Sequence, residues 1–129
     1  MSGAQQLLAG GSSSSVTYVD DVFSTYLYTG NGSTQTITNG IDLAGQGGLV
    51  WIKHRATGST NHQMIDTART GSKVLASNSI GGEDNTSLTF NSNGFYLASG
   101  WAHNQNNETY ASWSFRKAAK FFDVQTAIS

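Results

Sequence analysis

The chain has 129 residues, of which 37% are hydrophobic and 11% aromatic, which is enough for one buried core. Only 12% of the residues are charged and the net charge is −1, so the clustered Lys and Arg of a nucleic-acid-binding protein are missing. The absence of cysteine excludes disulfides and cysteine-based sites, and the absence of an apolar run of about 18 residues excludes membrane insertion through a helix.

Residues 1–15 differ in composition from the rest of the chain. Their sizeable apolar side chains are Met1, Leu7 and Leu8, and the segment ends in two glycines and four serines. Such a segment cannot bury enough apolar surface to fold alone, but its backbone can pair with another protein. We therefore expect an N-terminal arm, with Leu7 and Leu8 as its assembly contacts, followed by one β-domain over residues 16–129.

From residue 16 onward the sequence is typical of short β-strands separated by turns, because β-branched and aromatic residues recur in short runs. The predicted strands are residues 16–19, 22–28, 34–38, 49–52, 63–66, 73–77, 87–91, 94–99 and 109–116. Asn-Gly steps ending at Gly32, Gly40 and Gly94 predict tight turns, because both residue types tolerate a positive φ. Only residues 118–122 are predicted to form a helical turn.

Two of these strands carry predictions about burial. The apolar run at residues 49–52 follows a glycine pair and is too short for a helix, which predicts a fully buried strand with Trp51 in the core. Large and small residues alternate in 109–116, which predicts one buried face with Trp113 and Phe115 turned inward. Strands at this spacing predict an all-β fold, an antiparallel β-sandwich or jelly roll.

No pattern in the sequence predicts catalysis, and we expect a protein that is not an enzyme and uses no cofactor. A nucleophile elbow, a P-loop and a dinucleotide fingerprint are all missing. The eight carboxylates and three histidines form no pair whose spacing predicts acid–base chemistry. For His54, His62 and Asp66 we favour hydrogen bonding at strand ends over a shared metal ion.

The remaining polar residues predict structural roles. Residues 83–85 offer oxygen atoms for a weak calcium site, but the alternating ligands of a dedicated loop are missing and the preceding glycine pair favours a plain turn. For Asp66 and Arg69 we favour a structural pair, in which Asp66 caps a turn and Arg69 pairs with a carboxylate, over contact with a ligand.

The loop at residues 100–108 is the most suggestive surface in the sequence. It combines one tryptophan with several amides, and such residues stack on a sugar ring and bond its hydroxyls. The candidate ligand-binding residues are Trp101, His103, Asn104, Asn106 and Asn107. The same composition also suits an ordinary hairpin loop whose tryptophan folds back on the core, and both interpretations stay open.

The order of several motifs resembles the repeat modules of tailed-phage virion proteins. The motifs are Gly-Leu-Val-Trp-Ile-Lys at residues 48–53, the Asp66-x-x-Arg69 turn, and the Asn93-Gly94-Phe95 hairpin, within a region from Phe23 to Val124. Those modules are concanavalin-like, LamG-like β-sandwiches. The resemblance therefore implies a bacteriophage virion structural protein, a tail-fibre or tail-associated module that takes part in host attachment.

The resemblance also implies partners and a location. We expect contacts with other virion proteins and with further copies of the chain, a trimer being one arrangement, in the virion and in its tail more than on its capsid. The alternatives are a glycan-binding module that recognises the host surface through the Trp101 loop and a capsid decoration protein. No nucleic-acid partner is expected.

Overall fold

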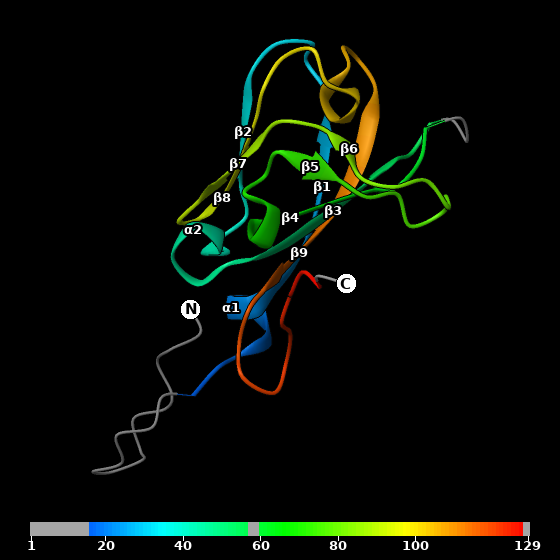
Figure 1. Cartoon of the computed structure of the whole chain (residues 1–129). Coiled ribbons are helices and arrows are strands. Elements are labelled where there is room, and N and C mark those ends of the chain that lie inside the picture. Colours follow the sequence, from blue (N-terminus) through cyan, green and yellow to red (C-terminus); the bar gives the residue numbers. More distant parts are fainter. Residues whose placement is uncertain (1–15, 57–59, 128–129) are drawn as a thin grey trace.

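A computed structural model describes residues 16–56 and 60–127 of the chain. The predicted arm at residues 1–15, with Leu7 and Leu8, lies outside the described residues. The described part is mostly β-strand with a few short helices, and its strand pairings are antiparallel (Figure 1). The predicted all-β class is confirmed.

The described strands form one large and two smaller sheets. The large sheet has the strand order β1 (Phe23–Thr29), β9 (Thr109–Arg116), β3 (Gly48–His54) and β4 (Gln63–Asp66). The second sheet has the order β2 (Gln35–Thr38), β8 (Gly94–Leu97) and β7 (Leu88–Asn91). The third pairs β5 (Lys73–Val74) with β6 (Asp84–Asn85). Every strand predicted from residue 22 onward overlaps one of these, and β6 was not predicted.

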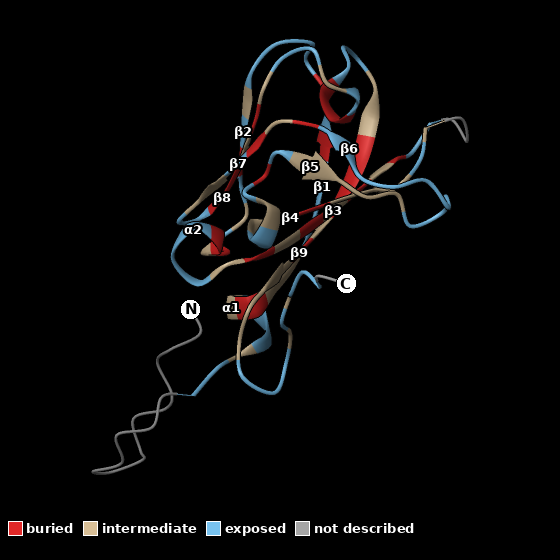
Figure 2. Cartoon of the chain, viewed as in Figure 1, coloured by how far each residue is buried: buried red, intermediate tan, exposed pale blue. Residues whose placement is uncertain are grey.

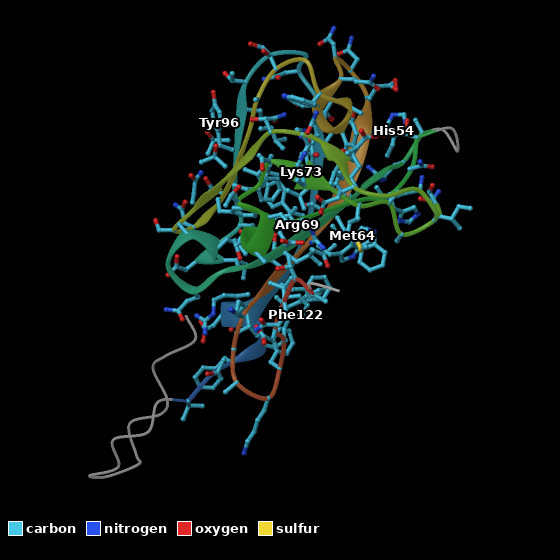
Figure 3. All side chains as sticks on the ribbon, in the orientation of Figure 1. His54, Met64, Arg69, Lys73, Tyr96 and Phe122 are labelled. Carbon is cyan, nitrogen blue, oxygen red and sulfur yellow. The ribbon has the colours of Figure 1, made fainter. Side chains whose placement is uncertain are left out.

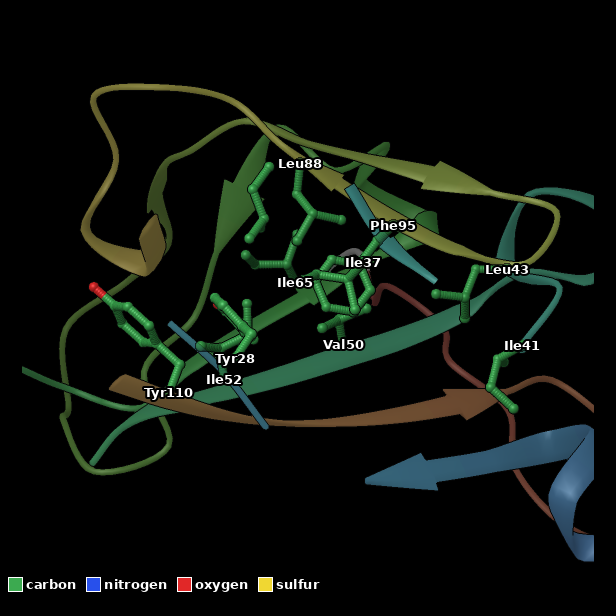
Figure 4. Packing of buried hydrophobic residues seen from close by; sticks show 11 residues of the cluster. Tyr28, Ile37, Ile41, Leu43, Val50, Ile52, Ile65, Leu88, Phe95 and Tyr110 are labelled. Atoms are coloured by element: carbon green, nitrogen blue, oxygen red, sulfur yellow. The ribbon is translucent and has the colours of Figure 1, made fainter. Parts of the chain in front are cut away.

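The core lies between the four-stranded and the three-stranded sheets, as Figure 4 shows. The four-stranded sheet contributes Val50, Ile52, Ile65, Tyr28 and Tyr110, and the other sheet contributes Ile37, Leu88, Phe95 and Leu97. Ile41 and Leu43 close one end of this cluster and are both fully buried. In Figure 2 the buried segments lie mainly along the strands and most connecting loops are exposed, but the loop that contains His103 and Asn104 is buried in part.

The predicted strand at residues 16–19 is wrong, because Val19 begins the short helix α1 (Val19–Val22). Local hydrogen bonds favour the helical turn. The backbone N–H of Tyr18 donates to the carboxylate of Asp21 at 3.2 Å, and the N–H of Asp21 donates to the carbonyl of Tyr18 at 3.0 Å. A second short helix, α2 (Leu43–Gln46), was also missed; the Asp42 carboxylate accepts from the N–H of Gly45 at its start.

The predicted helical turn at residues 118–122 is also wrong. Ala118 and Phe122 instead form a β-bridge, with each backbone N–H donating to the other's carbonyl at 3.0 and 3.1 Å. Lys120 has a φ of 65°, in the left-handed region, which reverses the chain more tightly than a helix does. By contrast, the three Asn-Gly steps have the predicted positive φ at their glycines. At Gly94 a Cβ would lie 1.9 Å from the carbonyl oxygen of Ile37, so only glycine fits there.

The predictions that Trp51, Trp113 and Phe115 lie in the core are wrong. In β3 the buried positions are Gly48, Val50, Ile52 and His54, and Trp51 is half-buried on the opposite face. In β9 Ser112 and Ser114 are fully buried, whereas Trp113 and Phe115 are half-buried.

The inward serines of β9 are accommodated because other residues fill the core. The Ser112 hydroxyl donates to the carbonyl of Tyr26 at 3.0 Å, and the Ser114 hydroxyl accepts from the side chain of Asn39 at 2.9 Å. These bonds satisfy the buried hydroxyls. Tyr110 of β9, branched residues of β3 and the side chains of β8 then supply the apolar volume, and β9 presents Trp113 and Phe115 on the face that is turned away from the core.

Candidate functional site

The face of the four-stranded sheet that is turned away from the core is rich in rings, and we call it the aromatic face. Side chains of directly paired residues share a face of a sheet. Trp51 is paired with Trp113 and with Met64, and Phe115 is paired with Phe23 and with Leu49. The aromatic face therefore includes Phe23, Leu49, Trp51, Met64, Trp113 and Phe115, and it draws on all four strands.

The rings of the aromatic face contact one another edge-on or tilted. The ring centroids of Trp51 and Trp113 lie 6.1 Å apart at 71°, and those of Phe23 and Phe115 lie 5.1 Å apart. The ring of Phe122, labelled in Figure 3, lies 5.4 Å from that of Phe115 and extends the cluster at one end. These are the separations that aromatic pairs prefer.

The polar atoms and charges on this face are already engaged. The indole N–H of Trp51 donates to Nδ1 of His62 at 3.0 Å, so that nitrogen carries no proton. Lys53 belongs to the same face by its pairing with Ala111, and its ammonium group donates to the backbone carbonyl of His54. Apart from the exposed Thr25, the surface that remains available to a partner is therefore apolar.

The aromatic face is hollowed at its centre. The hollow has a volume of about 340 Å³ and is lined by five rings, those of Phe23, Trp51, His62, Trp113 and Phe115. Large apolar patches that stay accessible in a folded protein mark sites of interaction. Sequence reasoning missed this surface because it assigned the same tryptophans and Phe115 to the core.

The Trp101 loop is held by two tyrosines of the core. The Tyr28 hydroxyl donates to the carbonyl of His103 and the Tyr110 hydroxyl donates to the carbonyl of Ala102, each at 2.7 Å. The two phenol rings are stacked, with centroids 5.1 Å apart. Burial raises the pKa of both phenols above 10, so both hydroxyls stay protonated as donors.

Two of the five candidate ligand-binding residues are buried in this loop. Asn104 is 1% exposed; its Oδ1 accepts from the N–H of Asn31 and the amide of Gln35, and its Nδ2 donates to Asn31 and to the carbonyl of Ser33. These four bonds, of 2.7 to 3.1 Å, fill the capacity of the amide. Asn104 therefore joins two loops of the protein and has no bond left for a ligand.

His103 is fully buried as well. Its Nε2 lies 3.3 Å from the hydroxyl of Thr86. Burial lowers the pKa of His103 to about 4, so the ring is neutral at pH 7.

The other three candidates lie at the surface. Trp101 is half-buried, whereas Asn106 and Asn107 are exposed. Trp101 and Asn106 border a hollow of about 460 Å³ together with Gln105, an exposed amide that the sequence analysis did not select. Asn107 instead forms the turn, with a φ of 64° and its N–H donating to the carbonyl of Gly30 at 2.9 Å. The structure thus brings together Trp101, Gln105 and Asn106.

The expected structural pair of Asp66 and Arg69 is confirmed. The Asp66 carboxylate accepts from the N–H of Arg69 at 2.9 Å and caps the 3-10 turn at Thr67–Arg69. The Arg69 guanidinium pairs with Asp66 and with Glu83, the latter at 2.8 Å. Glu83, one of the candidate calcium ligands, is thereby held by an arginine.

The remaining histidine, His54, is buried and bonds Glu108 at 2.9 Å. Among the described residues, no three His, Asp or Glu side chains come together as a metal site requires. Within residues 16–56 and 60–127, no helix reaches the length and hydropathy needed to cross a membrane.

A family described as a domain of unknown function (DUF7483) matches residues 19–127, and the chain belongs to this family. The matched residues include every described strand, the aromatic face and the Trp101 loop. Neither the curated proteins nor the solved structures contain a match to the chain.

Proposed function

We propose that the protein is a structural protein of a bacteriophage virion, a tail-fibre or tail-associated module that assembles through its aromatic face and takes part in host attachment. The observation that carries the assembly role is the hollow lined by five rings on an accessible sheet face. The virion role draws its support from the motifs at residues 48–53, 66–69 and 93–95, which resemble those of tailed-phage modules.

In this proposal the two larger sheets form a concanavalin-like β-sandwich or jelly roll. A core shared between them supports that arrangement. Residues 1–15 dock the domain onto the particle, and its partners are other virion proteins and further copies of the chain. Low net charge favours such close association because like-charged neighbours repel little.

We propose no enzymatic activity and no cofactor. The titratable groups described above hold loops in place: Asp66 caps a turn, Glu108 bonds His54, and His103 bonds Thr86. Such roles suit a rigid architectural domain.

The test is the location of the chain in particles produced by the phage or prophage that encodes it. Mass spectrometry of purified virions should detect the chain among the structural proteins, and immunogold labelling should mark the tail. A version without residues 1–15 should fold with a cooperative melt and be missing from the particles. Absence of the full chain from purified virions would reject the proposal, and label on the capsid would favour a decoration protein.

A second function, recognition of a host glycan, is favoured by the surroundings of Trp101. Trp101 borders the hollow that Gln105 and Asn106 also line. It borders a second hollow of about 450 Å³, which Gln63, Asp84 and Asn85 also line. An aromatic ring between hydrogen-bonding groups suits a sugar. On a glycan array, binding that Trp101→Ala abolishes and Trp51→Ala preserves would support this function. An array without any binding would reject it.

A further inference from the structure

We propose that the aromatic face is the contact between two copies of this chain, packed face to face about a two-fold axis. This inference rests on the assembly role proposed above and names its first partner. The occupant of the hollow is the Leu27 side chain of the second copy.

Leu27 is an exposed apolar residue on the same face as the hollow. Leu27 pairs with Ala111, and Thr25, two positions earlier on β1, pairs with Trp113. Because residues two positions apart on a strand point to the same side, Leu27 lies on the aromatic face. The residue is 56% exposed, at the open edge of the sheet. A leucine that remains this accessible beside an apolar hollow is a natural contact for a partner.

The hollow and Leu27 are complementary and lie on one surface of one chain. Along β1, Leu27 lies two positions from the partner of Trp113 and four positions from Phe23, which is roughly 7 to 14 Å from these two lining residues at about 3.4 Å per residue. A two-fold axis between them would bring each Leu27 into the hollow of the other copy, so that both contacts form at once. A trimeric ring needs its two complementary patches on different sides of the domain, whereas the hollow and Leu27 lie on the same face.

The charges of the face permit contact between identical surfaces. The strand pairings place the charged residues Lys53 and Asp66 on this face, and the ammonium group of Lys53 is turned to the carbonyl of His54. The guanidinium of Arg69 is matched by Asp66 and Glu83. With a net charge of −1, two copies repel each other little.

The size of the face predicts a dimer of modest affinity. The four strands have 7, 8, 7 and 4 residues, and at about 4.8 Å between strands and about 3.4 Å per residue they give a projected area of roughly 420 Å². A stable interface buries about 800 Å² of accessible surface on each partner, and rugged side chains expose more than their projected area. The aromatic face is therefore a contact at the small end of this range, and we expect a dissociation constant of about 1–100 µM.

Sedimentation velocity of the full chain from about 1 to 500 µM tests this inference, a range set by the expected affinity. The wild type should convert reversibly from monomer to dimer. Leu27→Ser, which removes no core contact, and Trp113→Ser should each raise the dissociation constant by about 30-fold, the effect of a central interface residue. Ile80→Ser is the matched control, because Ile80 is fully exposed on a loop outside the aromatic face, and should leave the constant unchanged. Thermal melts confirm that the variants fold.

Crosslinking tests the geometry independently of affinity. The chain has no cysteine, so an introduced one has no competitor. A mixture of Leu27→Cys and His62→Cys chains should form a disulfide-linked dimer under oxidation, since the two thiols come together only between copies. Thr38→Cys, on the exposed side of β2, should give no such product with His62→Cys.

A wild type that stays monomeric at about 500 µM, forms trimers, or dimerises equally well as Leu27→Ser would overturn the inference. These outcomes are independent of the virion experiment. A dimer that never enters particles would reject the proposed virion role alone, whereas a monomer found in particles would reject only the two-fold contact.

Discussion

The aromatic face and the Trp101 loop use their side chains in opposite ways. The loop is polar in composition, yet Asn104 and His103 are turned inward and bonded within the protein. The face is formed by apolar residues, yet Trp51 and Trp113 are turned outward and border an open hollow. Residue type alone therefore does not identify an interaction surface. A surface is available for interaction when its side chains have hydrogen-bonding or packing capacity that the protein itself does not use.

Replacing Asn104 should give the largest loss of stability. Asn104→Ala removes four hydrogen bonds that join the loop to residues 31–35, and we expect the free energy of unfolding to fall by about 3 kcal/mol. The matched control, Asn106→Ala, replaces an exposed amide and should cost at most about 0.5 kcal/mol. Urea denaturation measures both. Equal effects would mean that the loop is not anchored through Asn104.

The buried His103 should make stability depend on pH. Its pKa falls from 6.5 to about 4 on folding, so between these values the unfolded chain binds a proton that the folded chain does not. Stability should therefore be fully present above pH 6.5, decline by up to about 3 kcal/mol as the pH falls to 4, and level off below. His103→Gln should flatten this decline and His62→Gln should not. An unchanged decline in His103→Gln would exclude His103 as its source.

On the aromatic face, Trp51→Ala should have a smaller effect than a core substitution. A fully buried aromatic residue costs about 3–5 kcal/mol when it is replaced by alanine, whereas Trp51 is half-buried and should cost about 1–2 kcal/mol. Phe95→Ala, in the core, serves as the reference. Denaturation at about 0.5 µM, below the expected dissociation constant, keeps the dimer from contributing. A loss for Trp51 equal to that for Phe95 would show that the face is part of the folded core.

Leu27→Ser should give the smallest effect on the monomer. The side chain is 56% exposed, and we expect a change in unfolding free energy within about 0.5 kcal/mol at the same low protein concentration. The same substitution should strongly weaken self-association. Thermal denaturation at low and high protein concentration separates the effect on the monomer from the effect on self-association. A large loss of stability at low concentration would assign Leu27 to intramolecular packing.

The class of fold and most of the strands were predictable from local patterns. Alternation of branched and aromatic residues located β1, β3 and β9, and the Asn-Gly step at Gly94 located the hairpin between β7 and β8. These signals are local because a strand repeats every two residues and a tight turn requires a positive φ. Helix α1 was missed because its stabilising bonds come from Tyr18 and Asp21, residues that are poor indicators of a helix.

The direction of each sheet face was not predictable in the same way. Alternation shows that Trp113 and Ser112 point to opposite sides, but the buried side is decided by where the second sheet packs. The same limit applies to the loop. Asn104 bonds Asn31, which lies 73 positions earlier, and no local pattern connects them. Of the candidate residues that composition suggested, Trp101, Asn106 and Asn107 remain at the surface.

The inward serines of β9 have a consequence for protein engineering. Because the core contribution of this central strand consists of Tyr110 and two small hydroxyl residues, its bulky side chains can be exchanged without changing the shape of the interior. Positions 111, 113 and 115, together with their neighbours on β1 and β3, form a contiguous panel on a cysteine-free backbone. Randomising this panel would turn the domain into a scaffold for selecting new binding proteins.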